Sequence, residues 1–315
     1  MTMQRFRIKD LGQVDRSKPL RFKFDGKFYE GYRGDTLASA LLANGIHLVG
    51  RSFKYHRPRG LLSAGAEEPN ALIQVGEGNS TDPNTRATQI ILRDGLTVTS
   101  QNRWPNLTFD LGYVNNLIHR LLPAGFYYKT FMWPASWWMR YEYWIRQAAG
   151  LGEAPKGADP DRYEKNHAHC DVLIVGSGPA GLSAALAAGQ TGARVILTEE
   201  QDSFGGSLTY NTDCTIDGAP AFEWAERTVA ALSSMPEVIL LKATVTTGYY
   251  DHNYLTLLES TDNDNQTGSE YKTRQRLWKV RAKRVVLATG QIERPLIFRD
   301  NDRPGIMLSA SMRAY

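Results

Sequence analysis

Cysteine is almost absent from this sequence. Among 315 residues there are only two cysteines, Cys170 and Cys214, and they form neither a CxxC pair nor another metal-ligand spacing. A disulfide scaffold, a zinc site built on cysteines and an iron–sulfur cluster would each need more thiols, or more closely spaced ones. The scarcity of cysteine therefore predicts that the protein contains none of the three.

A strong excess of charge and a long apolar run are also missing. The net charge of +4 is small and the basic residues are spread along the chain, so nucleic acid is not a predicted partner. The N-terminus, MTMQRFRIKDLGQ, lacks the apolar region of a secretory signal. Residues 126–144 hold ten aromatic side chains, but Lys129 and Arg140 interrupt them. A membrane span needs about 20 mostly apolar residues, so we predict no span there.

A chain of 315 residues is long enough for two domains, and the first is predicted at residues 20–98. LRFKF and FYEGY flank Asp25-Gly26, which is a strong hairpin signal. TLASALLANG follows and predicts a helix with its N-cap at Asp35 or Thr36. Strands and one helix in this order predict a β-grasp domain, the fold of plant-type ferredoxins. We expect it to be cluster-free, because the three closely spaced cysteines of that fold are absent.

The rest of the chain is predicted to form two further segments. Residues 99–169 are an aromatic-rich connecting segment that ends in a polar stretch with proline and glycine. Residues 170–315 are predicted to be a Rossmann-type FAD/NAD(P)-binding domain, incomplete at its end, so that the chain combines α+β and α/β classes. Tyrosine and tryptophan are typical of interface cores, so the aromatic stretch fits either an interface or packing between the two domains.

The stretch DVLIVGSGPAGLSAALAAGQTGARVILTEE carries the strongest functional signal. Gly176, Gly178 and Gly181 have GxGxxG spacing between an apolar strand and an alanine-rich helix. The first glycine allows a tight turn, the second lets phosphates approach the backbone, and the third lets helix and strand pack closely. The helix starts near Ala180, so its N-terminal N–H groups would face a pyrophosphate. The alternative is a glycine turn that packs a βαβ unit and binds nothing.

Several polar and glycine positions after this motif are candidates for nucleotide contacts. Glu199 and Glu200 follow the next strand, where an acid binds a ribose hydroxyl, and the absence of an adjacent arginine favours NAD or FAD over NADP. Ser207, after Gly205-Gly206, fits either a phosphate contact or a solvated loop. VVLATG ends at Gly290, where a later strand would return to the nucleotide. The motif does not separate NAD from FAD.

Longer stretches resemble one family across nearly the whole chain. GDTLASALLANG, RSFKYHRPRG, SQNRWPNLTFDLG, LPAGFYYKTFMWP and ATGQIERPLIFRDNDRPG are similar to the α subunits of heterotetrameric sarcosine oxidases. The resemblance implies a cytoplasmic oxidoreductase complex with β, γ and δ subunits, no nucleic acid and no membrane. That complex oxidises the N-methyl group of sarcosine to give glycine, hydrogen peroxide and formaldehyde. With tetrahydrofolate it gives methylenetetrahydrofolate, a reaction of one-carbon metabolism.

The resemblance also implies cofactors and contacts. NAD would bind in this chain, FMN at the interface with the β subunit and FAD in the β subunit, with no iron–sulfur cluster. Neither catalytic residues nor metal ligands are predicted, and the chain alone is expected to be inactive. Because family α subunits are much longer, folate chemistry is not assigned to these residues. The expected dinucleotide contacts are Gly176, Gly178, Ala180, Gly181, Glu199, Glu200, Gln201, Ser207, Val245 and Gly290.

Two other functions stay open at this point. One is an assembly subunit whose bound nucleotide is purely structural. The other is a subunit of a related amine or opine oxidase or of hydrogen cyanide synthase, although those relatives carry the cysteines that this chain lacks. The loop GRSFKYHRPRG replaces the cysteine loop, and we hypothesise that it docks a partner subunit or a flavin phosphate; a solvated basic loop is the alternative. Its basic residues are Arg51, Lys54, His56, Arg57 and Arg59.

Overall fold

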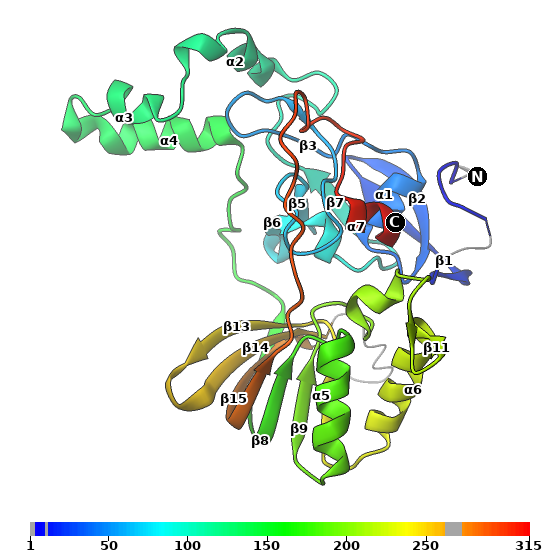
Figure 1. Cartoon of the computed structure of the whole chain (residues 1–315). Coiled ribbons are helices and arrows are strands. Elements are labelled where there is room, and N and C mark those ends of the chain that lie inside the picture. The colour runs from blue at the N-terminus through cyan, green and yellow to red at the C-terminus, as the bar shows by residue number, and fades with distance from the viewer. Residues whose placement is uncertain (1–3, 10–11, 262–272) are drawn as a thin grey trace. The chain divides into compact units, whose positions relative to one another are not determined.

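The computed structural model describes residues 4–9, 12–261 and 273–315 (Figure 1). The chain divides into two compact units. The first unit comprises residues 1–159 together with 293–313, and the second comprises residues 160–292. Within the described ranges, none of the helices combines the length and the apolar character that a bilayer crossing requires.

A mixed five-stranded sheet forms the centre of the first unit. Asp25 and Gly26 both have positive φ, 46° and 80°, as a two-residue hairpin turn between antiparallel strands requires. The hairpin that the sequence predicts is therefore present. The order of strands is β2 (Lys27–Arg33), β1 (Asp15–Phe24), β7 (Thr97–Ser100), β5 (Leu72–Val75) and β6 (Asp82–Arg86), with β1 and β7 parallel and the other neighbours antiparallel.

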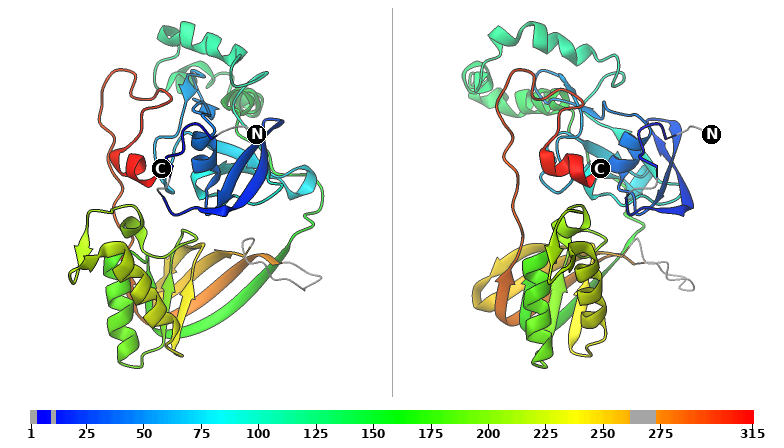
Figure 2. Two further views of the ribbon diagram at one scale, coloured as in Figure 1. Left: turned by 90° about the vertical axis from the view of Figure 1, so that its right-hand side faces the viewer. Right: turned by 45° about the vertical axis from the view of Figure 1, so that its right-hand side comes forward.

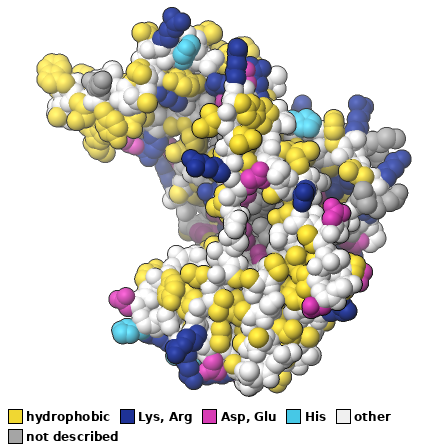
Figure 3. Space-filling model, viewed as in Figure 1, with side chains coloured by type: hydrophobic (Ala, Val, Ile, Leu, Met, Phe, Trp, Pro, Cys, Tyr) yellow, Lys and Arg dark blue, Asp and Glu magenta, His cyan; other side chains and the backbone are white. Residues whose placement is uncertain are grey.

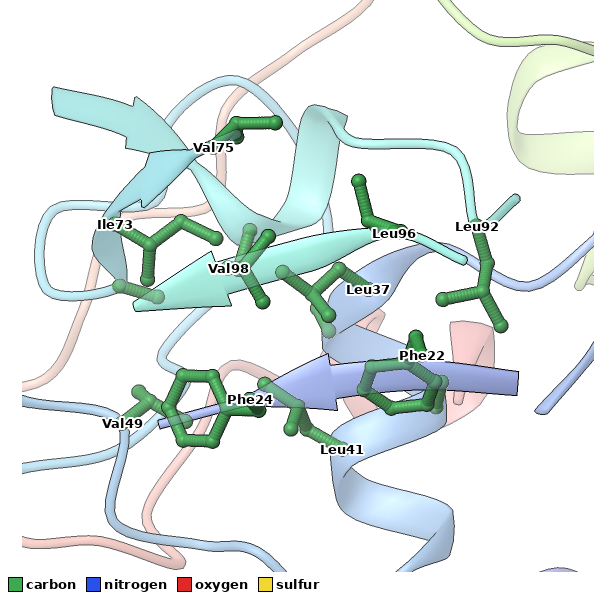
Figure 4. Close-up of a cluster of buried hydrophobic side chains, with 14 of the residues drawn as sticks. Phe22, Phe24, Leu37, Leu41, Val49, Ile73, Val75, Leu92, Leu96 and Val98 are labelled. Carbon is green, nitrogen blue, oxygen red and sulfur yellow. The ribbon is translucent and has the colours of Figure 1, made fainter. Parts of the chain in front are cut away.

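One helix, α1 (Leu37–Ala43), covers this sheet and closes its core. The side chain of Thr36 caps the helix by accepting a hydrogen bond of 3.1 Å from the backbone N–H of Ser39. Figure 4 shows Leu41 facing Phe22 and the neighbouring strands, and both side chains are fully buried. Truncating such a leucine to alanine typically costs about 2–5 kcal/mol, so each of these buried side chains contributes substantially to the stability of the unit.

Short elements and a buried carboxylate complete the first unit. Glu68 is fully buried, and its carboxylate accepts hydrogen bonds from the backbone N–H groups of Leu62 (2.8 Å), Ser63 (2.7 Å) and Asn70 (2.8 Å). Such bonds satisfy a buried charge that would otherwise be costly.

The short elements of the first unit are β3 (Gly50–Arg51), β4 (Pro58–Arg59), η1 (Gly78–Ser80) and η2 (Ala87–Gln89).

Residues 111–149 form a helical arm on the first unit, shown in green at the upper left of Figure 1. The predicted connecting segment is thus helical over much of its length. Its elements are η3 (Leu111–Tyr113), α2 (Val114–Leu117), η4 (His119–Leu121), α3 (Phe126–Thr130), η5 (Ala135–Trp137) and α4 (Trp138–Ala149).

The C-terminal segment returns to the first unit. It ends in α7 (Ser309–Ala314), and the backbone N–H of Leu308 donates to Leu62 O at 2.8 Å. The hydroxyl of Tyr315 donates to Ser63 O at 2.9 Å, and burial raises the pKa of this phenol. Residues 293–313 therefore pack with the N-terminal domain, although the sequence assigns them to the C-terminal one.

A six-stranded sheet forms the second unit. Four of its strands are parallel and two antiparallel strands extend one side, so the carboxyl ends of the parallel strands meet at one edge. The sequence boundary at residues 169–170 falls inside β8, which is continuous through it. The order is β12 (Val238–Leu241), β9 (Val195–Thr198), β8 (Arg162–Val175), β15 (Thr273–Leu287), β14 (Tyr254–Ser260) and β13 (Thr244–Tyr250).

Two helices, α5 (Pro179–Gln190) and α6 (Ala221–Ser233), pack side by side against this sheet (Figure 2). Leu182 of α5 and Leu232 of α6 are fully buried beneath them. Within β8, Asp171 accepts hydrogen bonds from the guanidinium of Arg194, which hold the pKa of this carboxyl far below its usual range. The remaining elements are η6 (Gly206–Thr209), β10 (Thr215–Ile216), β11 (Ala219–Pro220) and η7 (Asp251–Asn253).

The two cysteines differ in a way that solution chemistry can measure. Burial raises the pKa of the Cys170 thiol from 9.0 to about 11, whereas Cys214 is exposed. Because the thiolate is the nucleophile, we expect one fast-reacting thiol in the folded chain at pH 8 and two after denaturation, counted with a chromogenic disulfide reagent. The stability that the neutral Cys170 contributes is present below pH 9 and is lost as the pH rises through about 11. Two fast thiols in the folded chain would contradict this burial.

Candidate functional site

The glycine motif forms the turn between β8 and α5 at the carboxyl edge of the parallel strands. Gly176 has φ +96°, and a Cβ built on it would lie 2.3 Å from Ala288 O. A Cβ on Gly181 would lie 1.9 Å from Gly176 O. No side chain fits at either distance, so these two positions require glycine for backbone conformation and for close packing of helix, turn and β15.

Gly178 differs from the other two motif glycines because the space beside it is open. It is the N-cap of α5 with an extended backbone, and a Cβ built on it would meet no atom within 4 Å. The N–H groups of Ala180 and Gly181 are in the first turn of the helix, where a donor has no partner within the helix. The helix is regular from its start, since Leu182 N donates to Gly178 O at 2.9 Å. This is the geometry that receives a phosphate group.

Glu199 follows β9 directly and lies against the glycine turn. Its Oε2 accepts hydrogen bonds from Ser177 N at 3.0 Å and from Ser177 Oγ at 2.5 Å, while Oε1 accepts one from Gln201 N at 3.0 Å. The residue is buried. The carboxylate therefore braces the turn, and it stands where the acid of a dinucleotide fold meets a ribose.

A second glycine loop packs against the first. Ser177 Oγ accepts a hydrogen bond of 3.1 Å from Gly205 N. A Cβ on Gly206 would lie 3.0 Å from Gly178 Cα, so the two loops approach each other at backbone distance. Ser207 is in the short helix η6 and half-buried. Ser177 thus links Glu199, the glycine motif and the second loop, a role that its place inside GxGxxG did not reveal.

The structure brings most of the predicted contacts to this edge of the sheet. Glu199 O accepts a hydrogen bond of 2.7 Å from Thr244 N, which places the backbone of Val245 next to this strand end. Glu200 and Gly290 are both exposed, Gly290 beyond the end of β15. Ala288 ends the VVLATG strand that the sequence predicts to return to the nucleotide. Its N–H donates to Val175 O at 2.8 Å, and its carbonyl faces Gly176.

The basic loop of the first unit is engaged within that unit. Arg57 Nη2 lies 2.7 Å from Asp302 Oδ1 and 3.2 Å from Asp300 Oδ1, and Arg59 Nη1 lies 2.7 Å from Asp302 Oδ2. The C-terminal segment thus neutralises these arginines. Arg51 and His56 are buried at the base of the helical arm. The docking hypothesis had these basic groups facing a partner, whereas the structure pairs them inside the chain.

Two family models match separate parts of the chain. Residues 17–103 match a model described as a 2Fe-2S iron-sulfur cluster binding domain. Residues 171–276 match a model described as FAD dependent oxidoreductase. The second match contains the glycine motif, Glu199 and the loop at Gly205.

Two curated relatives align over almost the entire chain. The sarcosine oxidase subunit alpha of Rhizobium meliloti (strain 1021) is 54% identical over 99% of this chain and 32% of its own length. The protein of the same name from Corynebacterium sp. (strain P-1) is 38% identical over 96% of this chain and 27% of its own length. The chain therefore spans about a third of the length of these relatives.

A solved structure has the same fold. The L-proline dehydrogenase from P. horikoshii superposes with a TM-score of 0.57 at 22% identity, covering 95% of this chain and 46% of its own. At this identity the likeness concerns the fold alone.

The family matches correct the predicted fold class. We expected a cluster-free domain, but residues 17–103 match a family model described as a 2Fe-2S iron-sulfur cluster binding domain. The expectation rested only on the missing cysteines, whereas a family model is matched over the whole domain, including its sheet and helix. The fit of the residues to the group is a separate matter. Residues 17–103 contain no cysteine, and clusters are held by cysteine thiolates, so these residues do not fit a cluster.

The predicted cofactor is corrected as well. We expected NAD in this chain, whereas the matched family is FAD-dependent. The physical reason is that the motif binds the ADP half that both dinucleotides share, so it holds no information on the other half. The residues fit such a group: open space at Gly178, N–H donors in the first turn of α5 that have no acceptor within the helix, and the Glu199 carboxylate at the strand end.

Proposed function

Because the chain belongs to the family of sarcosine oxidase alpha subunits, we propose that it is the dinucleotide-binding part of an oxidoreductase complex that oxidises sarcosine. The dinucleotide is FAD, as the matched family supports. The complex contains β, γ and δ subunits and works in the cytoplasm.

The observation that carries this proposal is the open glycine turn at Gly178. The pyrophosphate would lie against the backbone there and accept hydrogen bonds from Ala180 N and Gly181 N. The adenosine ribose would hydrogen-bond to Glu199, which Ser177 and Gln201 already hold in place. Glu200, Ser207, Val245 and Gly290 would line the outer part of the site.

In the proposed reaction, the N-methyl carbon of sarcosine loses two electrons and dioxygen gains them. Sarcosine, dioxygen and water then give glycine, formaldehyde and hydrogen peroxide, and tetrahydrofolate takes the one-carbon unit as methylenetetrahydrofolate. When bound, a flavin supplies the two-electron acceptor chemistry. The residues of this chain bind and orient the nucleotide, and substrate binding belongs to the parts of the complex outside it.

The test is to purify the complex, denature it and identify the released nucleotides by mass spectrometry and absorbance. The same measurement on this chain expressed alone shows which nucleotide belongs to it. For the chain expressed alone we expect FAD at close to one equivalent per chain. A nicotinamide dinucleotide would keep the site but overturn the flavin assignment, and no nucleotide in either preparation would overturn the proposal.

A further inference from the structure

The helical arm, residues 111–149, exposes an unusual amount of aromatic and aliphatic surface. None of its described side chains is buried. Trp133 is 84% exposed, Leu121 is 76% exposed and Trp144 is 70% exposed. Figure 3 shows hydrophobic side chains gathered over this arm, at the upper left. An exposed patch of this kind marks an interaction site, because isolated soluble chains rarely leave contiguous apolar surface uncovered.

Specific contacts hold the arm on its unit along its length. At its start and end, His56 Nδ1 lies 2.7 Å from Asp110 Oδ2 and His56 Nε2 lies 3.0 Å from Ala148 O. In the middle, Tyr55 Oη donates to Leu122 O at 2.7 Å. The loop that replaces the cysteine loop of the ferredoxin fold is therefore the seat of the arm. A seated arm presents its aromatic side chains in a fixed arrangement, which lowers the entropy cost of binding.

The positions of the exposed side chains around α4 indicate the shape of the surface that would cover the arm. At 100° per residue, Trp138, Met139, Tyr143 and Trp144 point to several sides of the helix rather than to one. A helix lying on a membrane has one apolar face and one strongly charged face. The exposed apolar side chains of α4 do not form such a single face, which favours a groove that contacts several sides of the helix over a flat bilayer surface.

The net charge of the arm indicates which kind of residue would line the margin of that groove. The basic residues exceed the single acidic one, and Glu142 is already paired with Arg146 at 3.2 Å. A carboxylate-rich margin would complement this charge. The charged residues of the arm are Arg120, Lys129, Arg140 and Arg146 against Glu142.

We propose that the helical arm docks into an apolar, acid-rimmed groove on a partner subunit of the same complex. The inference rests on the proposed function in one respect, namely that the chain works as a subunit, as its relatives are named. Trp133 and Trp144 are the central contacts, since exposed tryptophans that become buried on binding carry much of the interface energy.

The experiment compares native complexes that carry Trp133→Ala, Trp144→Ala or the control Phe28→Ala. Phe28 is 58% exposed on β2, outside the arm. Subunit dissociation is followed by dilution and light scattering, and circular dichroism checks the fold. We expect each tryptophan variant to weaken the subunit Kd by roughly tenfold or more and the control to leave it unchanged. The same Kd for the double variant and the wild type would overturn the proposal.

Two further measurements distinguish a partner subunit from other surfaces that could cover the arm: a pair of substitutions at Arg140 and a footprinting experiment. Arg140→Glu should weaken assembly, with a dependence on salt, while Arg140→Lys should not. Hydroxyl-radical footprinting should show Trp133 and Trp144 protected in the complex and reactive in the same subunit, at the full length found in the complex, once it is separated from its partners. If Trp133 and Trp144 were protected without the partners, this chain itself or a second copy of it would cover the arm. If the chain bound anionic vesicles and the tryptophan and Arg140 variants abolished that binding, the arm would be a membrane-binding element instead. Nucleotide content, measured on the same samples, reports the site at Gly178 independently.

Discussion

Gly178→Ala is expected to abolish dinucleotide binding while leaving the fold intact. A Cβ at this position meets no atom within 4 Å, and φ −63° with ψ −176° is a conformation that alanine adopts freely. The free chain therefore has room for the methyl group. The phosphates would have to occupy that same space to reach the backbone. We expect an affinity loss of at least roughly 100-fold, measured as nucleotide retained per chain, with an unchanged melting temperature in the absence of nucleotide.

Gly181→Ala is the matched comparison, because it adds the same methyl group three residues away. There the Cβ would lie 1.9 Å from Gly176 O, and backbone has to move to accommodate it. Such overpacking costs about 1–3 kcal/mol or more, so this variant should unfold at a lower denaturant concentration even without nucleotide. If Gly178→Ala instead retained its nucleotide at wild-type affinity, the phosphate site would not be at this turn.

The sequence predicted the parts of the molecule that depend on neighbouring residues. The hairpin at Asp25-Gly26 and the helix capped by Thr36 follow from turn and capping preferences, which act over a few residues. The strand–turn–helix at Gly176 is local in the same sense. Each of these elements required only backbone rules and an apolar pattern.

Contacts between distant residues were not predictable in this way. Nothing local in RSFKYHRPRG indicates that Arg57 pairs with Asp302, which is 245 residues further along the chain. The arm's attachment through His56 and Asp110 depends on how the loops return to the same place. The role of Ser177 is similar, because it appears only when the ends of β8 and β9 are adjacent.

Glu199→Gln is expected to weaken both the site and the fold, and the two effects can be separated. The native carboxylate accepts three hydrogen bonds, two from Ser177 and one from Gln201, and all the donors lie close to it. A glutamine amide has only one acceptor oxygen, so its NH₂ group would face an N–H donor on one side. A buried group left unsatisfied costs about 1–3 kcal/mol, which predicts a measurable drop in the free energy of unfolding.

The nucleotide affinity of Glu199→Gln should fall further than this loss of stability explains. In the proposed site the ribose hydroxyl would donate to the carboxylate, so a charge-assisted hydrogen bond would be lost in addition to the brace. Ser177→Ala is the control, because it keeps the carboxylate while it removes the 2.5 Å contact to Glu199 Oε2 and the 3.1 Å contact from Gly205 N to the same hydroxyl. Calorimetric titration of both variants with nucleotide should give clearly weaker binding for Glu199→Gln. Equal affinities, together with equal losses of stability, would mean that Glu199 only supports the turn and that the ribose binds elsewhere.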